Sequence, residues 1–239
     1  MIDIFCTAIR RPIIVEETFK SFKENLFKNH KCRLIINVDP VGENISSYEI
    51  VEIGKKYFDE IYPNTPTEAS FSRAFKWVMS QGKNEYVFNL EDDWLLLREC
   101  DLSDMINILE RNKNLACIRL PNADFSCKWP ANIPKIFLED GKISLDHRFC
   151  GHPALWKMDF FRDALKIYDE NINPERQFRF DYEENKLEMK NLFKKWQLGV
   201  FYDKLYIKDI GRRYGGRKNR APKIYEYTEK YKYLVKWEI

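Results

Sequence analysis

The N-terminal part of the chain alternates short apolar runs with amphipathic segments, and this alternation limits the folds that it can adopt. A strand, a helix and a second strand in succession are typical of βαβ units, whose strands run parallel. The sequence therefore predicts an α/β fold with a mostly parallel, Rossmann-like sheet flanked by helices. The expected elements are strands at 3–8, 33–38, 60–62 and 85–90, and helices beginning at Pro12, at Ser46 or Ser47, and at Thr67.

The fourth apolar run ends on three consecutive acids, Glu91, Asp92 and Asp93. The run is short and rich in aromatic and β-branched residues, so it predicts a buried strand. Open α/β sheets bind ligands at the carboxyl edge, where these acids would lie. Adjacent carboxylates repel one another, and a hard divalent cation held together with a phosphate would offset the repulsion. The alternative is a solvated acidic turn, which the apolar run 94–97 makes less favourable.

The second half of the chain is less regular. It contains no internal repeat, low-complexity segment or flexible linker, which favours one domain, residues 1–207, with a basic loop and a helical tail at 208–239 packed on it. The tyrosine-rich tail 224–235 is expected to be a docking helix. The other expected elements are helices at 103–111 and 158–168, a helix carrying Tyr182, Met189, Phe193 and Trp196, strands at 116–120 and 200–207, and a hairpin around Asp140-Gly141.

Charge is unevenly distributed along the chain. The 239 residues carry a formal net charge of +3. Residues 208–223 hold seven basic side chains and one acid, a net charge of +6, which leaves 3 − 6 = −3 for the remainder. A positive patch on a mildly acidic body predicts a phosphate-bearing partner. The alternative is a solvated basic loop, but Gly211, Gly215 and Gly216 favour a specific backbone path, because glycine lets the main chain approach a ligand closely.

The sequence shows no sign of export or membrane insertion. Residues 1–5 lack the charged and long apolar regions of a secretory signal, and no apolar stretch is long enough to cross a bilayer. The six cysteines are scattered without close pairs, which is typical of reduced thiols in a cytosol. We therefore expect a cytoplasmic protein without a transmembrane segment, and the sequence leaves open a peripheral contact with a membrane.

Several segments, in their order along the chain, carry a resemblance to a known enzyme family. They are Phe5–Ala8, Asn37–Asp39, Ala69–Ala74, Glu91–Asp93, Asp146–Trp156, Asp181–Glu184 and Asp209–Arg212. Together they resemble a glycosyltransferase of the GT-A fold, near the large family 2 group. The acid triplet lies where that family keeps its DxD-like metal motif. Two departures are that the motif begins with Glu91 rather than aspartate, and that Asp209 stands where many relatives carry histidine.

The resemblance implies a nucleotide-sugar donor, a hydroxyl acceptor and a divalent cation, Mn²⁺ or Mg²⁺. It implies donor contacts at the end of the first strand, near the base and over the phosphates, from Thr7, Arg10, Asp39, Arg73, Asp92, Arg212 and Arg213. It implies a metal site at Asp93, Glu91 and the late-loop Asp209. It also implies that an acid at Glu183 or Glu184 acts as the base in an inverting single displacement.

The residue types suit this chemistry. Breaking the bond between a sugar and a diphosphate leaves negative charge on the leaving group, which a bound cation can absorb. Asp93 is the first choice for a direct ligand with Glu91 assisting, while Asp92 meets the ribose or an ion-bound water. Arginine pairs well with phosphate oxygens. A carboxylate from Glu183 or Glu184, with Glu175 behind them, can take the acceptor proton, although acids in the first turn of a helix are also favoured by its dipole.

Three other interpretations compete with this one. A nucleotidyltransferase usually has a glycine-rich loop after the first strand, and residues 7–12 contain no glycine. A zinc site at Cys127, Cys150 and His152 lacks the paired spacing of zinc ligands. A nucleic-acid-binding protein, or one that glycosylates nucleic acid, would use the basic segment 208–223 and would bind in a salt-sensitive way without a metal.

Overall fold

Four strands in the N-terminal part of the chain pair in parallel, as the sequence predicts. The computed structural model describes residues 1–121, 136–139, 141–146, 149–178, 187–201 and 204–211. In this half the elements are β1 (Ile2–Arg10), α1 (Pro12–Asn25), β2 (Cys32–Gly42), α2 (Ser47–Lys55), β3 (Glu60–Asn64), α3 (Phe71–Ser80) and β4 (Tyr86–Asn89). β1 lies between β2 and β4, and β3 pairs with β2, all in parallel. The carboxyl ends of these strands therefore meet at one edge.

The sheet continues through the second half of the chain with mixed strand directions. Its order is β3-β2-β1-β4-β9-β6-β10-β8-β7, and a separate pair joins β5 and β11. β9 runs antiparallel between β4 and β6. The remaining elements are β5 (Trp94–Leu96), α4 (Leu102–Arg111), β6 (Leu115–Arg119), β7 (Phe137–Leu138), β8 (Ile143–Asp146), β9 (Ala154–Lys157), α5 (Met158–Leu165), α6 (Pro174–Gln177), α7 (Leu187–Lys195), β10 (Gln197–Phe201) and β11 (Ile207–Asp209).

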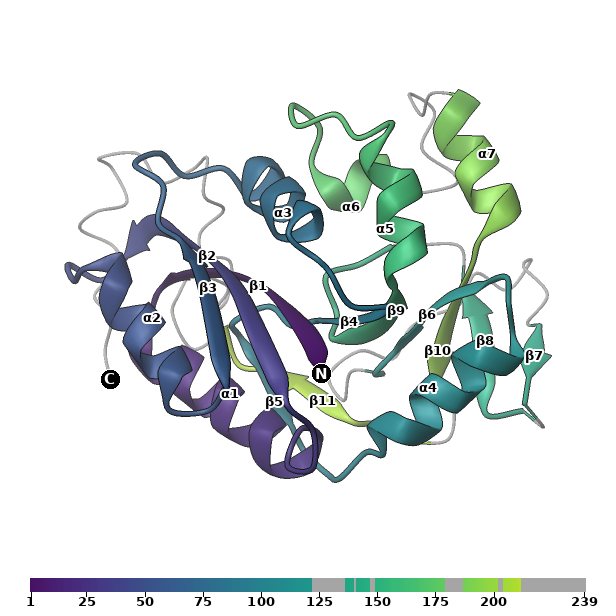
Figure 1. Ribbon diagram of the computed structural model, residues 1–239, viewed down its shortest axis with the longest axis horizontal. Coiled ribbons are helices and arrows are strands. Elements are labelled where there is room, and N and C mark those ends of the chain that lie inside the picture. The colour runs from purple at the N-terminus through teal and green to yellow at the C-terminus, as the bar shows by residue number, and fades with distance from the viewer. Residues whose placement is uncertain (122–135, 140, 147–148, 179–186, 202–203, 212–239) are drawn as a thin grey trace.

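Helices cover both faces of the sheet (Figure 1). Side chains of β1 alternate between the two faces: Ile4 and Cys6 belong to the core under α1, α2 and α4, and Phe5 belongs to the core under α3, α5 and α7. The second core is rich in aromatic side chains, with Trp156 and Phe161 fully buried in it. Among the described residues, no helix combines the length and the apolar composition that a membrane-spanning segment requires.

Local sequence signals explain where most helices begin. Pro12 occupies the first turn of α1, where its missing N–H is not needed, and Ser46 forms a capping box with Glu49 at α2. The helix expected from Thr67 begins four residues later, after the N-cap Ser70, whose backbone is extended and whose side chain accepts from the Arg73 N–H. The Ser70 N–H donates to Asp39 instead of joining a helix.

One predicted strand is wrong in its extent. The expected strand at 200–207 is divided between β10, which pairs with β6 and β8, and β11, which pairs with β5 outside the main sheet. The predicted hairpin around Asp140-Gly141 is present as the antiparallel pair β7–β8. The predicted division of the chain at residue 207 stays a prediction, because residues 212–239, including the expected tail helix, lie outside the described residues.

Candidate active site

The carboxyl ends of β2 and β3 present a chain of polar side chains around Asp39. The Asn64 side-chain amide donates to Asn37 Oδ1 at 2.6 Å, and Asn37 Nδ2 donates to Asp39 Oδ1 at 2.9 Å. The Ser70 backbone N–H donates to Asp39 Oδ2 at 3.1 Å. Burial raises the pKa of Asp39, against these hydrogen bonds and the nearby charge of Arg73. The network holds a carboxylate in a fixed orientation at the sheet edge.

The predicted acids lie in a turn that leaves the end of β4. The Leu90 N–H donates to the Phe5 carbonyl at 2.8 Å and extends the sheet, and β5 then carries the chain away against α1. Asp92 is 2% exposed and points into the protein, where it accepts a hydrogen bond from the Ile9 N–H at 3.0 Å. The side chain of Asp93 is 23% exposed, so of these two neighbouring aspartates only Asp93 is open to a ligand.

Arg11, which sequence reasoning missed, is the counter-ion of both aspartates. Its Nε donates to Asp92 Oδ2 at 2.9 Å, its Nη2 pairs with Asp92 Oδ1 at 2.5 Å, and the same Nη2 lies 3.0 Å from Asp93 Oδ2. Burial opposes its charge, but the two aspartates outweigh burial and raise the pKa of Arg11. Arg10, the residue predicted from sequence, donates instead to the Ser47 hydroxyl at 3.0 Å.

Glu91 turns toward a segment from the second half of the chain. A Cβ at Gly151 would overlap with its carboxylate, so the Glu91 side chain lies directly against this backbone. The Gly151 N–H donates to Glu175 Oε1 at 3.2 Å, and the His152 ring packs against Trp94 with ring centroids 4.8 Å apart. Burial and the charges of Asp93, Glu175 and Asp92 raise the pKa of Glu91 well above its ordinary value. Glu91 and Glu175 are therefore neighbouring acids at the turn.

The segment after β11 closes over the acidic turn. Asp209 lies opposite Trp94 in the β5–β11 pair, and the Ile210 N–H donates to the Asp93 carbonyl at 2.9 Å. A Cβ at Gly211 would overlap with Asp93 Oδ2, so this backbone approaches the carboxylate closely. Burial raises the pKa of Asp93 to about 6, with Asp92 and Asp209 adding to it and Arg11 opposing it. The basic residues Arg212 and Arg213 follow directly in the sequence.

The acidic turn fits a cation only if a ligand supplies further oxygens. Within the described ranges, no group of three His, Cys, Asp or Glu side chains is placed to hold a metal ion. Asp92 is held by Arg11 and Ile9, which leaves Asp93, with Glu91 and Asp209 near it. Mg²⁺ is commonly bound through one or two carboxylates together with substrate phosphates. Asp93, with a raised pKa and a partly open side chain, suits such a shared site.

The structure gathers some of the predicted site residues and leaves others undescribed. Thr7 pairs with Asn37 at the adjoining ends of β1 and β2, near Asp39. Arg73 lies in the first turn of α3, where its Nη2 pairs with Glu68 at 3.1 Å. The proposed bases Glu183 and Glu184 and the proposed phosphate ligands Arg212 and Arg213 lie outside the described residues.

Comparison with known proteins identifies the fold. No model of a known protein family matches the sequence, and no curated protein matches it. Solved structures do match: S. aureus TarS at 13% identity and a TM-score of 0.61 over 87% of this chain, and TarS 1–349 in complex with UDP-GlcNAc at 13% and 0.59 over 87%. The mannosyltransferase PcManGT from Pyrobaculum calidifontis, in complex with GDP-Man and Mn²⁺, matches at 9% and 0.61 over 91%.

These matches define the class of the fold. The chain has the GT-A fold of glycosyltransferases, which confirms the α/β architecture predicted from the sequence. The chain spans 36% of the TarS structure and 58% of the PcManGT structure. Nucleotide-sugar donors are bound in the TarS and PcManGT complexes, and Mn²⁺ in the latter.

Proposed function

We propose that the protein is a metal-dependent glycosyltransferase, which moves a sugar from a nucleotide-sugar donor to a hydroxyl acceptor. The observation that carries the proposal is the partly open Asp93, held at the carboxyl edge of a GT-A sheet with a raised pKa. A divalent cation at Asp93, shared with the donor diphosphate, would neutralise this carboxylate and absorb the charge of the leaving group. The TarS and PcManGT complexes support a nucleotide-sugar as the donor.

The donor would lie along the edge formed by β1, β2 and β4. Asp39 would face the nucleotide base, with Thr7 beside it and Arg73 at the mouth of the site. Both oxygens of Asp92 already accept hydrogen bonds from Arg11 or Ile9, so we propose that Asp92 reaches the donor through Arg11 or a water. Arg212 and Arg213 follow Gly211 in the sequence, and in the proposal their guanidinium groups would cover the diphosphate.

The acceptor proton needs a carboxylate on the opposite side of the sugar. Glu183 and Glu184 keep this role in the proposal, and Glu175 is a third candidate because it lies beside Gly151 and next to Glu91. A single displacement assisted by one base would invert the anomeric centre. Separate substitutions E175Q, E183Q and E184Q should distinguish them, since loss of the base lowers the transfer rate roughly 100-fold while donor binding persists.

A panel of nucleotide-sugars, each with and without Mn²⁺, tests the proposal. We expect one donor to raise the melting temperature by roughly 5 °C, and only when the cation is present. D93N should lose this shift and lower sugar transfer by roughly 100-fold, whereas D159N, at a surface pair with Arg162, should retain both. A cation-independent shift, or an active D93N, would contradict the metal-dependent scheme. Tight, salt-sensitive binding of RNA or DNA without metal would favour the nucleic-acid alternative.

We also propose that the protein is cytoplasmic. Cys6 and Cys32 are buried and free thiols, which supports the cytoplasmic location expected from the sequence. Peripheral contact with a membrane stays a prediction, to be tested by sedimentation with lipid vesicles.

A further inference from the structure

Two buried arginine–aspartate pairs in the described part of the chain differ in one respect. Arg33 donates from Nε and Nη2 to both oxygens of Asp3, at 2.9 and 2.8 Å. Arg11 holds Asp92 in the same two-pronged way. Arg33 Nη2 also donates to the Gln81 carbonyl, whereas Arg11 Nη2 reaches the second carboxylate, Asp93. Arg11 therefore bridges two carboxylates, whereas Arg33 pairs with only one.

The third nitrogen of Arg11 is left without an acceptor. Nη1 is buried, and no hydrogen-bond partner is within its reach among the described residues. It lies beside Gly211, since a Cβ there would be 3.0 Å from it. A buried N–H of a charged group without an acceptor is costly and calls for an explanation in a folded protein. Because this nitrogen lies beside Asp93 and Gly211, an anion that reached Asp93 would also reach it.

The same bridge occupies the carboxylate that a cation would need. Arg11 contacts Asp93 Oδ2, Asp92 is committed to Arg11 and Ile9, and the Glu91 carboxylate packs against Gly151. No three-ligand group exists in the described ranges. A divalent cation arriving alone must therefore displace a positive charge from Asp93 and gains few oxygens in return.

We propose that Arg11 is a positioning residue that makes cation binding depend on a diphosphate. The proposal rests on the proposed function. In the donor complex, a phosphate oxygen would bind Arg11 Nη1 and draw the guanidinium away, so that the contact of Nη2 with Asp93 Oδ2 opens and Asp93 is released to the cation. After the exchange the phosphate pairs with the positive charge of Arg11, and the cation pairs with the negative charge of Asp93. Every charge therefore has a counter-ion only when the diphosphate and the cation bind together. Binding of either one then strengthens binding of the other by the same factor.

The test measures Mn²⁺ affinity from the resonance signal of the free ion, with and without UDP or GDP. In the wild-type protein the nucleotide should tighten Mn²⁺ binding by roughly tenfold or more. R11M should reduce this factor to less than about threefold, mainly by tightening the binding of Mn²⁺ alone, since a counter-charge has been removed. R33M is the matched control, because it removes a buried pair of the same geometry far from the acidic turn, and it should keep the wild-type factor.

R11K is a second variant, which keeps the proposal testable if R11M does not fold. It keeps one positive charge but cannot form the two-pronged bridge, so the factor should fall by roughly threefold. An unchanged factor in R11M or R11K would overturn the proposal, as would weaker binding of Mn²⁺ alone in R11M. If the wild-type protein bound no nucleotide-sugar of the panel and no nucleoside diphosphate, the proposed function would fail instead. The affinity for Mn²⁺ without nucleotide would then still test whether Arg11 blocks the cation. Tighter binding in R11M than in the wild type would support this role, and equal or weaker binding would contradict it.

Discussion

Three consecutive acids have three different environments at the residue scale. Asp92 is buried and held by a guanidinium, Asp93 is partly open with a pKa raised to about 6, and Glu91 packs against Gly151. The three acids are adjacent in the sequence, so the differences come from Arg11, Gly151 and Gly211, which reach the turn from other parts of the chain. A role for each acid follows from these partners rather than from its place in the motif.

This contrast predicts that D92N and D93N differ in stability. D92N leaves the buried Arg11 with a weakened partner, which should lower the free energy of unfolding by about 3 kcal/mol. D93N removes a carboxylate whose charged form is disfavoured by burial and by Asp92 and Asp209, so it should change stability by less than about 1 kcal/mol. Urea unfolding of both variants at neutral pH measures the difference. Equal losses would show that Arg11 depends on the two acids alike.

Gly211 provides a second prediction at this scale. A methyl group there would overlap with Asp93 Oδ2 and crowd Arg11. We expect G211A to weaken Mn²⁺-dependent nucleotide binding by roughly tenfold, with a loss of about 1–3 kcal/mol in stability from overpacking. Calorimetric titration with UDP or GDP and Mn²⁺ gives the affinity. Wild-type affinity in G211A would mean that the segment moves away from the turn when the donor binds.

At the scale of secondary-structure elements, a charged contact joins helices α5 and α7. Asp163 on α5 accepts from Lys195 at 2.6 Å, from Lys166 at 3.0 Å and from the Trp196 indole at 3.2 Å. Burial alone would raise the pKa of Asp163, but these partners outweigh it and lower the pKa from 3.8 to about 2. The contact fastens the end of α7 to the helix that packs on β9.

The lowered pKa predicts how this contact depends on pH. The unfolded chain takes up the proton first as the pH falls, so the stabilisation is complete above roughly pH 5 and is lost between roughly pH 4 and 2. D163N should therefore cost about 2 kcal/mol at pH 7 and progressively less below pH 4. Urea unfolding over this pH range tests it, with D159N, at an exposed pair, as the control expected to change stability by less than about 0.5 kcal/mol. A pH-independent loss would contradict the ionic origin.

Elements with a regular pattern could be predicted from the sequence, and those made by pairing with distant strands could not. β1 to β4 are apolar runs with helices between them, and their existence and order follow from that alternation. β5 has three residues and β9 has four, too few for a periodic signal. β9 inserts antiparallel between β4 and β6, and no local feature of its sequence specifies those neighbours.

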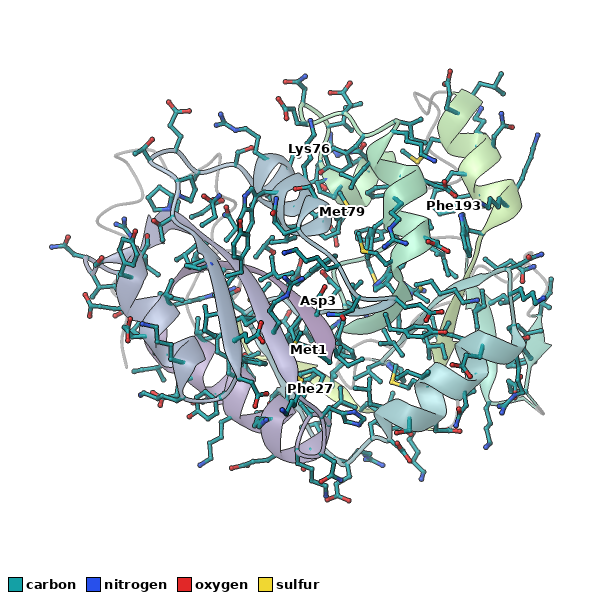
Figure 2. The ribbon with its side chains drawn as sticks, viewed as in Figure 1. Met1, Asp3, Phe27, Lys76, Met79 and Phe193 are labelled. Carbon is teal, nitrogen blue, oxygen red and sulfur yellow. The ribbon has the colours of Figure 1, made fainter. Side chains whose placement is uncertain are left out.

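At the scale of the whole molecule, a buried hydrogen-bond network stabilises the edge of the sheet opposite the candidate site. Asp3, near the start of β1 (Figure 2), is fully buried and accepts from Arg33 and from the N–H groups of Lys83 and Asn84. Burial would raise the pKa of Asp3, but these donors together lower it. The network joins β1, β2 and the loop before β4.

D3N should therefore separate stability from binding. We expect a loss of about 3–5 kcal/mol in the free energy of unfolding, because Arg33 would be left buried with a weakened partner. The nucleotide affinity of the folded fraction should stay within about twofold of the wild-type value, since the side-chain hydrogen bonds of Asp3 within the described chain are to Arg33, Lys83 and Asn84 and not to the acidic turn. Urea unfolding and calorimetric titration of one preparation measure both. A parallel loss of affinity would show that the two sheet edges are coupled.

The candidate site could be predicted only in part, because the order of the strands in the sheet decides which segments meet there. Asp39 lies near the carboxyl end of β2 and Asp93 lies in the turn after β4, and the ends of strands are readable in the sequence. Arg11 and Gly151 matter because the sheet order brings their segments beside the turn. Gly151 lies in the segment 146–156 that carries the resemblance, but nothing in the sequence places it against Glu91, and Arg11 carries no local signal. Arg10 and Arg11 are adjacent arginines, and only the direction that the chain takes into α1 decides which one faces the acids.

The pairing of β5 with β11 has a consequence for biosynthesis. Residues 9–11 and 92–93 leave the ribosome early, but the backbone that packs on them, at 209–211, is nearly the last of the described chain to be made. A nascent chain can build the parallel half of the sheet while its acidic turn is still uncovered. Nucleotide binding should therefore mature only after residues 209–211 have been made, when β1 to β4 have already folded.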